Sequence, residues 1–426
     1  MAMQRRTFLV GAGLATVAAA AWLRPTRHGA PYQPYFEQLN RTLKAEGIGT
    51  PTLVLDLDRL RANARQVMSH TQGKVALRLV NKSLPCLSLL DELGKVCGTQ
   101  RQMVFSLPYL QLAAQERPGL DILMGKPMPI AAAASFYRDH RPSAFDPSRQ
   151  LQWLIDTPER LAQYRQLANS LHVPMQVNFE VDVGLHRGGI RSIETLQAMA
   201  RTVAADPLLH WSGLMGYDAH TEKVPDIAGN RDRSRAHAQA LYRQYADVMQ
   251  AAKLPRQAAH LTLNTGGSPT YRLHDGSDGA NEVAVGSAMV KPSDFDTDLL
   301  TDLQAAAFIA TPVIKVSNPF TAPYGAEWAS TALSTWDPNQ RASLFTYGGH
   351  WLAQPVAPEG LALSGLIGQS SNQQILVGSG QQALHPDDFV FFRPTQSEAV
   401  LQQFGDIAVF EQGRLVARWP VFPAMA

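Results

Sequence analysis

Short apolar runs alternate with helical patterns along most of the chain. The run Val75–Asn81 is β-prone, apolar up to Val80 except for Arg78, and bounded by Gly73 and Pro85, so it predicts a mostly buried strand. Seven further runs have the same character: Gln102–Ser106, Asp121–Gly125, Leu151–Asp156, Met175–Asp182, Trp211–Asp218, His260–Thr265 and Glu282–Gly286. Helical spacing of apolar residues fills most gaps, as in Arg59–His70, Pro158–Leu171, Ser192–Ala205 and Arg231–Ala252. Eight strands alternating with helices predict an α/β fold built on a parallel (β/α)8 TIM barrel.

The pattern changes beyond about residue 300. Short strand candidates are separated there by Gly, Pro and Asn turns, which predicts a C-terminal all-β domain. The segment Ser317–Asn339 is rich in Pro, Ala and Trp and is predicted to be a long loop. The strand candidates are Phe308–Val316, Ala342–Tyr347, Gln374–Val377, Phe389–Phe392, Ile407–Phe410 and Arg414–Trp419.

The composition is that of an ordinary globular protein. The chain has 426 residues, of which 45% are hydrophobic and 17% charged, and its net charge is +2. This balance provides no electrostatic basis for nucleic-acid binding. No stretch after the first 25 residues has the length and hydrophobicity of a transmembrane helix.

Residues 1–25 have the pattern of a twin-arginine export signal. Arg5 and Arg6 precede an uncharged, Gly/Ala-rich run from Val10 to Leu23, and Ala18–Ala21 offers a cleavage site of small residues. We therefore expect the export machinery as a partner and a periplasmic location. An uncleaved membrane anchor stays open as an alternative.

The two cysteines, Cys86 and Cys97, form no metal-binding motif. An oxidising compartment would permit a disulfide between them. The segment Leu84–Leu93 is predicted to be one helix, and a bridge across it would need close Cα atoms. We expect two partly buried thiols.

Lys82 follows the first barrel strand by two residues, at the end that forms the catalytic face of such barrels. A desolvated amine there can attack a carbonyl carbon, although a solvated surface lysine is the simpler interpretation of this spacing alone. The stretch Gly49–Asp58 followed by Arg78–Lys82 resembles the opening of the D-threonine aldolase/D-serine dehydratase family, which are pyridoxal-phosphate enzymes of the alanine-racemase fold. The resemblance implies that Lys82 carries pyridoxal 5′-phosphate, that Arg78 contacts it, and that the strand Leu53–Leu57 joins the β domain. Leu79 replaces the proline of the family motif.

Two further matches imply roles near the cofactor ring. The stretch Asn178–Gly189 is similar to the family's fifth barrel strand and implies that Arg187 approaches the cofactor phenolate or the substrate carboxylate. An ion pair of Arg187 with Asp182 is the structural alternative. The stretch Gly213–His220 is similar to the sixth strand and implies that Tyr217 and His220 lie at the barrel mouth. Tyr217 could instead belong to the core, and His220 could cap the surface.

The stretch Leu263–Thr270 is similar to the family's phosphate loop. Consecutive glycines let backbone N–H groups converge on an anion, and loops after strands seven and eight are the usual phosphate site of this barrel. The alternative is a plain Gly-Gly turn. Ala288 stands where the family has a tyrosine that contacts the phosphate. The phosphate ligands implied are Gly266, Gly267, Ser268 and Thr270.

The largest departure from the family lies at Arg393–Glu398. The family carries a histidine followed by cysteine or aspartate there, and these residues bind a divalent metal that holds the substrate's β-hydroxyl. In this chain the two positions are Gln396 and Glu398. Oxygen donors suit Mg²⁺ or Mn²⁺ better than zinc. Glu398 acting as a base without metal, and simple loss of the metal, are the alternatives.

The resemblance spans about Gly49 to Pro420. After the export signal expected at 1–25, it implies a cofactor-binding barrel at 26–300, from which residues 50–57 could join the β domain, and a β domain at 301–426. The expected activity is that of a lyase on D-3-hydroxy amino acids, giving glycine and an aldehyde or a keto acid and ammonia. A periplasmic amino-acid racemase is the alternative. The expected partners are the amino-acid substrate and, by analogy with the fold, a second copy in a homodimer.

Overall fold

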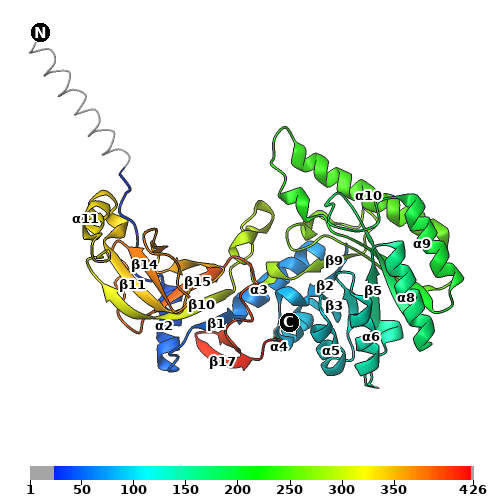
Figure 1. Ribbon diagram of the computed structural model, residues 1–426, viewed down its shortest axis with the longest axis horizontal. Coiled ribbons are helices and arrows are strands. Elements are labelled where there is room, and N and C mark those ends of the chain that lie inside the picture. Colours follow the sequence, from blue (N-terminus) through cyan, green and yellow to red (C-terminus); the bar gives the residue numbers. More distant parts are fainter. Residues whose placement is uncertain (1–23, 142, 424–426) are drawn as a thin grey trace, which may run out of the picture. The chain divides into compact units, whose positions relative to one another are not determined.

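The computed structural model describes residues 24–141 and 143–423, and the predicted signal peptide lies almost wholly outside them (Figure 1). The chain divides into two compact units. One contains Leu55–Ala307, Thr395–Val409 and residues 417–423, and the other contains residues 24–54, Phe308–Pro394 and Phe410–Val416. The sequence pattern predicts one boundary near residue 300. The chain instead returns to the first unit at Thr395, so the two units interleave in sequence.

The first unit is built on the predicted barrel. Eight parallel strands close in chain order, and the last pairs with the first in the register Ala76↔Glu282 to Leu79↔Val285. All eight predicted strands are present, with ends that differ by a few residues. They are β2 (Ala76–Val80), β3 (Arg101–Val104), β4 (Asp121–Met124), β5 (Leu151–Ile155), β6 (Met175–Val181), β7 (Leu209–Gly216), β8 (Gln257–Thr265) and β9 (Glu282–Val285).

Helices connect the barrel strands, and their local sequence explains their starts. Asp56, Thr157 and Ser192 each precede a helix and accept a hydrogen bond from the backbone N–H three residues later, which caps an end with unpaired donors. Among the described residues no helix is long and apolar enough to cross a membrane. The helices are α3 (Leu57–Thr71), α4 (Leu87–Cys97), α5 (Leu107–Glu116), α6 (Ile130–Asp139), α7 (Pro147–Gln150), α8 (Pro158–Leu171), α9 (Ile193–Ala205) and α10 (Asn230–Ala252).

The remaining strands form one sheet in the order β13-β14-β11-β10-β1-β16-β17, with β15 pairing β10 and β12. The strand β1 (Thr52–Asp56) lies between β10 and β16, so the first strand of the chain does join the β-rich part. The helix α2 (Pro34–Ala45) precedes it. The other strands are β10 (Ala307–Ser317), β11 (Ala342–Tyr347), β12 (Ala353–Ala357), β13 (Ala362–Leu363), β14 (Gln373–Gly378), β15 (Phe389–Pro394), β16 (Ile407–Glu411) and β17 (Arg414–Trp419).

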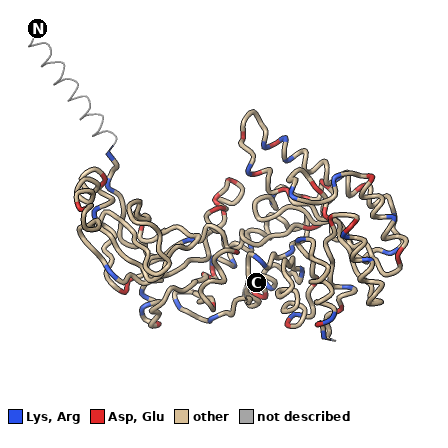
Figure 2. Tube along the Cα trace, in the orientation of Figure 1, with Lys and Arg blue, Asp and Glu red and all other residues tan. Residues whose placement is uncertain are grey.

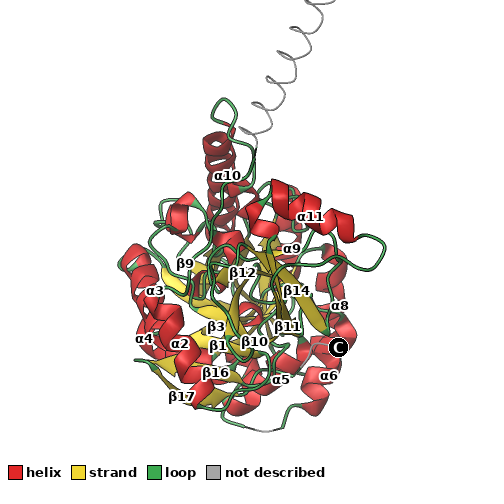
Figure 3. Ribbon diagram, turned by 90° about the vertical axis from the view of Figure 1, so that its left-hand side faces the viewer, coloured by secondary structure: helices red, strands yellow, loops and turns green. Residues whose placement is uncertain are grey.

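The predicted loop Ser317–Asn339 contains a helix, α11 (Glu327–Trp336), so that prediction was wrong (Figure 3). This helix buries only Ser330 and exposes Trp328. Trp328, Ala332 and Trp336 recur every four residues, which is a helical spacing, but the loop prediction rested on the composition of the segment. Positive and negative side chains are interspersed along the described trace (Figure 2).

Both cysteines are free and buried. The helix α4 begins at Leu87 rather than Leu84, with Cys86 at its N-cap and Cys97 as its last residue. The two thiols therefore lie at opposite ends of one helix, which explains why they do not form a disulfide.

Candidate active site

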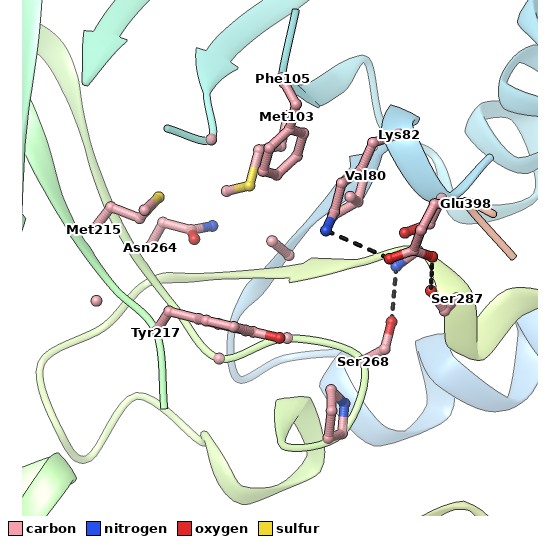
Figure 4. A pocket seen from close by; sticks show the side chains of 18 of the residues that line it. Val80, Lys82, Met103, Phe105, Met215, Tyr217, Asn264, Ser268, Ser287 and Glu398 are labelled. Carbon is pink, nitrogen blue, oxygen red and sulfur yellow. Dashed lines mark hydrogen bonds and ion pairs between the residues drawn. The ribbon is translucent and has the colours of Figure 1, made fainter. Parts of the chain in front are cut away.

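A cavity opens at the carboxyl end of the barrel strands (Figure 4). Its empty space is about 650 Å³ with the open mouth included, a size typical of small-molecule sites. Residues from the ends of β2, β3 and β7, from the loop after β8, and from the segment Thr395–Val409 line it. The lining residues include Lys82, Phe105, Arg187, Tyr217, Gly266, Gly267, Ser268, Ser287 and Glu398.

Lys82 projects into this cavity from a short 3-10 turn, Asn81–Ser83, that directly follows β2. Its Nζ lies 3.5 Å from Glu398 Oε1 and 5.0 Å from the centre of the Phe105 ring. The side chain is 37% exposed and lines the cavity. The strand end places this lysine where the sequence predicted it.

Glu398 belongs to the stretch that returns to the barrel unit. Its Oε2 accepts hydrogen bonds from the hydroxyls of Ser287, at 3.3 Å, and Ser397, at 3.0 Å. Burial favours the neutral acid, but a backbone N–H and the Lys82 ammonium outweigh it and hold the pKa of Glu398 below its usual value. The site therefore contains a carboxylate directly beside the candidate nucleophilic amine.

Arg187 and Tyr217 line the cavity together. The Arg187 guanidinium lies 5.0 Å from the centre of the Tyr217 ring, within the range of a cation–π contact. The structural alternative of an Arg187–Asp182 ion pair is not found, because Asp182 Oδ2 instead accepts from Arg191 Nε and His186 Nδ1. Arg187 is exposed, so its charge is available to a ligand.

The glycines after β8 bring the backbone close to its neighbours. Gly266 has a φ of +67°, which favours glycine, and a Cβ on Gly267 would lie 2.5 Å from Cε2 of Tyr217. The hydroxyl of Ser268 accepts hydrogen bonds from the backbone N–H groups of Gly286 and Ala288. Because these contacts use only the acceptor capacity of the hydroxyl, its own hydrogen is available to an anion in the cavity.

Thr270 does not line the cavity, contrary to its predicted role as a phosphate ligand. Its side chain is fully buried, donates to Asp218 Oδ1 at 2.6 Å, and accepts from the backbone N–H of Gly267 at 3.1 Å. Thr270 therefore stabilises the loop Gly266–Ser268 (the glycine loop) through a hydrogen bond to its backbone and does not face the cavity.

Arg78 also lies away from the cavity, so its predicted contact with a cofactor is not supported. Its guanidinium is completely buried and donates to Glu282, Asp121 and the carbonyl of Gln102. Glu282 and Asp121 are the first residues of their strands, so the guanidinium points toward the amino end of the barrel. The sequence alone does not distinguish a structural arginine in a barrel strand from an active-site arginine. The two differ in which end of the barrel the side chain points toward.

His220 is likewise absent from the cavity lining. It lies in a 3-10 turn, Ala219–Glu222, and a Cβ on Gly184 would lie 3.1 Å from its Nε2. Burial lowers the pKa of His220, and the nearby Asp218 carboxylate opposes that effect. Because His220 does not line the cavity, the structure gives no support for its predicted catalytic role.

Gln396 and Glu398 do not converge on a common point. Gln396 donates its side-chain N–H to Asp294 Oδ2 at 3.1 Å, whereas Glu398 faces Lys82. Within residues 24–141 and 143–423, no group of three His, Cys, Asp or Glu side chains has an arrangement that could hold a metal ion.

Several side chains of the cavity wall were not predicted from the sequence. Phe105 follows β3 directly, and Met215 and Asn264 lie near the ends of β7 and β8, so strand-end position alone could have suggested them. Their residue types carry no chemical signal, because apolar and amide side chains at strand ends are common. Ser287 would have needed knowledge of the fold, since its partner Glu398 is 111 residues away.

The chain is similar to a known protein family and to a curated protein. The family model described as "Alanine racemase, N-terminal domain" matches residues 55–294. The chain is 23% identical over 253 residues to a 3-hydroxy-D-aspartate aldolase of Paracoccus denitrificans (strain Pd 1222), a match that covers 58% of this chain and only 62% of that relative.

Solved structures are similar over nearly the whole chain. A D-threonine aldolase from Filomicrobium marinum has a TM-score of 0.68 at 19% identity and covers 94% of this chain and 98% of its own. A D-threo-3-hydroxyaspartate dehydratase from Delftia sp. HT23 has a TM-score of 0.67 at 17% identity, covering 89% and 98%. These likenesses establish a barrel with a second, all-β part as the fold.

Proposed function

Because the chain belongs to the family of the alanine racemase N-terminal domain, we propose that it is a pyridoxal 5′-phosphate-dependent lyase acting on D-3-hydroxy amino acids. The observation that carries the proposal is the Lys82 amine in a strand-end cavity beside the Glu398 carboxylate. The family match spans more than half of the chain and includes most of the cavity. The aldolase activity of the similar Paracoccus protein supports the reaction class.

The residues of the cavity fit the cofactor that this family membership supports. The amine of Lys82 can bind its aldehyde carbon, and the Ser268 hydroxyl with the glycine loop offers a place for a phosphate. A Cβ on Gly286 would lie 2.8 Å from Val80 Cβ, so the close packing of this part of the cavity wall requires glycine there. When bound, the cofactor supplies an electron sink for the bond that breaks at the substrate Cα.

The other residues bind the substrate and move its protons. Arg187 is exposed at the cavity and suits the α-carboxylate, since guanidinium can bind it in two-pronged fashion. Glu398 is positioned to take the proton of the β-hydroxyl, the step that releases an aldehyde and glycine. The Lys82 amine could take the Cα proton instead; the β-hydroxyl would then leave with a proton as water, and hydrolysis would give a keto acid and ammonia.

The donor set does not fit the metal site expected from the family. The Gln396 side chain is turned to Asp294, and Glu398 is held by Lys82, Ser287 and Ser397. We therefore propose that Glu398 acts without Mg²⁺ or Mn²⁺ at this position. The test is product formation before and after treatment with EDTA. Activity that is lost with EDTA and restored by Mn²⁺ would favour the metal alternative.

Product analysis tests the function as a whole. The protein loaded with the cofactor should convert D-threonine or D-phenylserine to glycine and an aldehyde, or to a keto acid and ammonia. The Lys82→Ala variant should lose the visible absorbance of the bound cofactor and reduce turnover at least about a thousandfold. Lys74→Ala, at an exposed lysine of the same unit, is the matched control and should behave as wild type. Formation of only the epimeric amino acid would move the assignment to a racemase.

We also propose export by the twin-arginine route to the periplasm and assembly as a homodimer. The first is supported by Arg5, Arg6 and the uncharged run that follows them, and the second by analogy with the fold. Replacing both arginines with lysine should keep the protein in the cytoplasmic fraction. Light scattering at several concentrations would measure the mass of the assembly.

A further inference from the structure

A buried network of four polar side chains contacts the loop Gly266–Ser268. Thr270 donates to Asp218 Oδ1 at 2.6 Å, and Asp218 Oδ2 lies 2.9 Å from Nε2 of His274. The other ring nitrogen of His274 lies 2.6 Å from Asp278 Oδ2. All four residues are at most 4% exposed, and none lines the cavity.

Two members of this network, Thr270 and His274, contact the loop directly. The Thr270 hydroxyl accepts from the backbone N–H of Gly267, and a Cβ on Gly266 would lie 2.8 Å from Cδ2 of His274. Asp218 directly follows Tyr217, and a Cβ on Gly267 would lie 2.5 Å from Cε2 of the Tyr217 ring. The network therefore ties the end of β7 to the loop after β8.

Charge holds the network together. Burial disfavours a charged imidazole, but the carboxylates of Asp218 and Asp278 outweigh it and raise the pKa of His274 to about 10. The raised pKa favours the protonated imidazole, which lies between the carboxyl groups of Asp218 and Asp278. Burying an ionic group of this kind costs desolvation free energy, and apolar residues of the same volume could stabilise the fold as well. We therefore interpret the network as fixing the local geometry of the loop rather than as adding to overall stability.

We propose that Thr270, Asp218, His274 and Asp278 are positioning residues that shape the loop Gly266–Ser268 to receive the phosphate group of the cofactor. The inference rests on the proposed function, because it assigns the phosphate to this loop. The four side chains touch no ligand themselves. They act through the backbone of Gly266 and Gly267 and through the place of Ser268, so their removal reduces affinity for the phosphate in particular.

The experiment compares two ligands that differ only in the phosphate, pyridoxal 5′-phosphate and pyridoxal. Dissociation constants are measured by absorbance for the cofactor-free wild type, Thr270→Val and Thr270→Ser. Valine keeps the shape of threonine and removes both hydrogen bonds, whereas serine retains the hydroxyl. Thr270→Val should bind pyridoxal 5′-phosphate at least about tenfold more weakly, with pyridoxal binding within about twofold of wild type. Thr270→Ser should stay close to wild type for both ligands.

His274→Gln is the second variant, and it should reduce the preference for the phosphorylated ligand in the same direction. Circular dichroism checks that each variant is folded, and a variant that fails this check leaves the decision to the other. Equal weakening of both ligands, or no weakening, would overturn the inference and leave a purely structural network. Wild-type protein that binds neither ligand would instead overturn the proposed cofactor.

Discussion

At the scale of single residues, Arg78 is a charged side chain that is completely buried in the barrel and paired with carboxylates. Its buried guanidinium donates to both oxygens of Glu282, at 2.6 and 3.1 Å. Arg78→Met would leave that carboxylate without its main partner, and we expect the free energy of unfolding to fall by about 3–5 kcal/mol. Urea denaturation monitored by circular dichroism measures the change.

A second replacement shows whether the lost charge is the cause. Adding Glu282→Gln to Arg78→Met removes the uncompensated carboxylate and should recover a substantial part of the stability. A double variant as unstable as the sum of the two single variants would contradict the ion-pair explanation and favour packing.

At the scale of elements, the strands were predictable and the exceptions have physical reasons. The barrel strands are short apolar runs, and such runs mark strands buried on both faces. The helix α11 was missed because its segment was judged by its Pro, Ala and Trp content, although Trp328, Ala332 and Trp336 recur at a helical spacing. The strand β12 contains Pro355 and pairs only with β15, so it tolerates a residue that normally argues against a strand.

The helix α4 carries the prediction that belongs to this scale. Its two cysteines lie about 16 Å apart along the axis, at about 1.5 Å per residue, which is far beyond the reach of a disulfide. Burial raises the pKa of Cys86 to about 11 and that of Cys97 to about 12. We expect no reaction of either thiol with Ellman's reagent at pH 8 in the folded protein, and two equivalents after denaturation. Release of fewer than two equivalents from the denatured protein would indicate oxidation.

At the scale of the whole molecule, the candidate site depends on residues that the sequence separates widely. Lys82, Arg187, Tyr217 and the glycine loop were predicted from the family resemblance, and each comes after a barrel strand, so the closed barrel brings them to one face. Arg78 and His220 were not separable from true site residues, since side-chain direction is set only by the closed barrel. The pairing of Glu398 with Lys82 depends on the return of the chain to the barrel unit at Thr395, a connection that no local pattern encodes.

Because His274 is buried between two carboxyl groups, we expect the free energy of unfolding of the protein to decrease as the pH rises above neutral. Its pKa rises from 6.5 in an unfolded chain to about 10 in the folded one, so the folded state binds the extra proton between these values. The stabilisation is therefore complete below about pH 6.5 and is lost as the pH rises through about 10. Urea midpoints measured from pH 7 to pH 10 should fall for wild type more steeply than for His274→Gln. Because exposed groups titrate alike in both proteins, the difference between the two curves isolates His274, and parallel curves would mean that the imidazole is neutral in the folded protein.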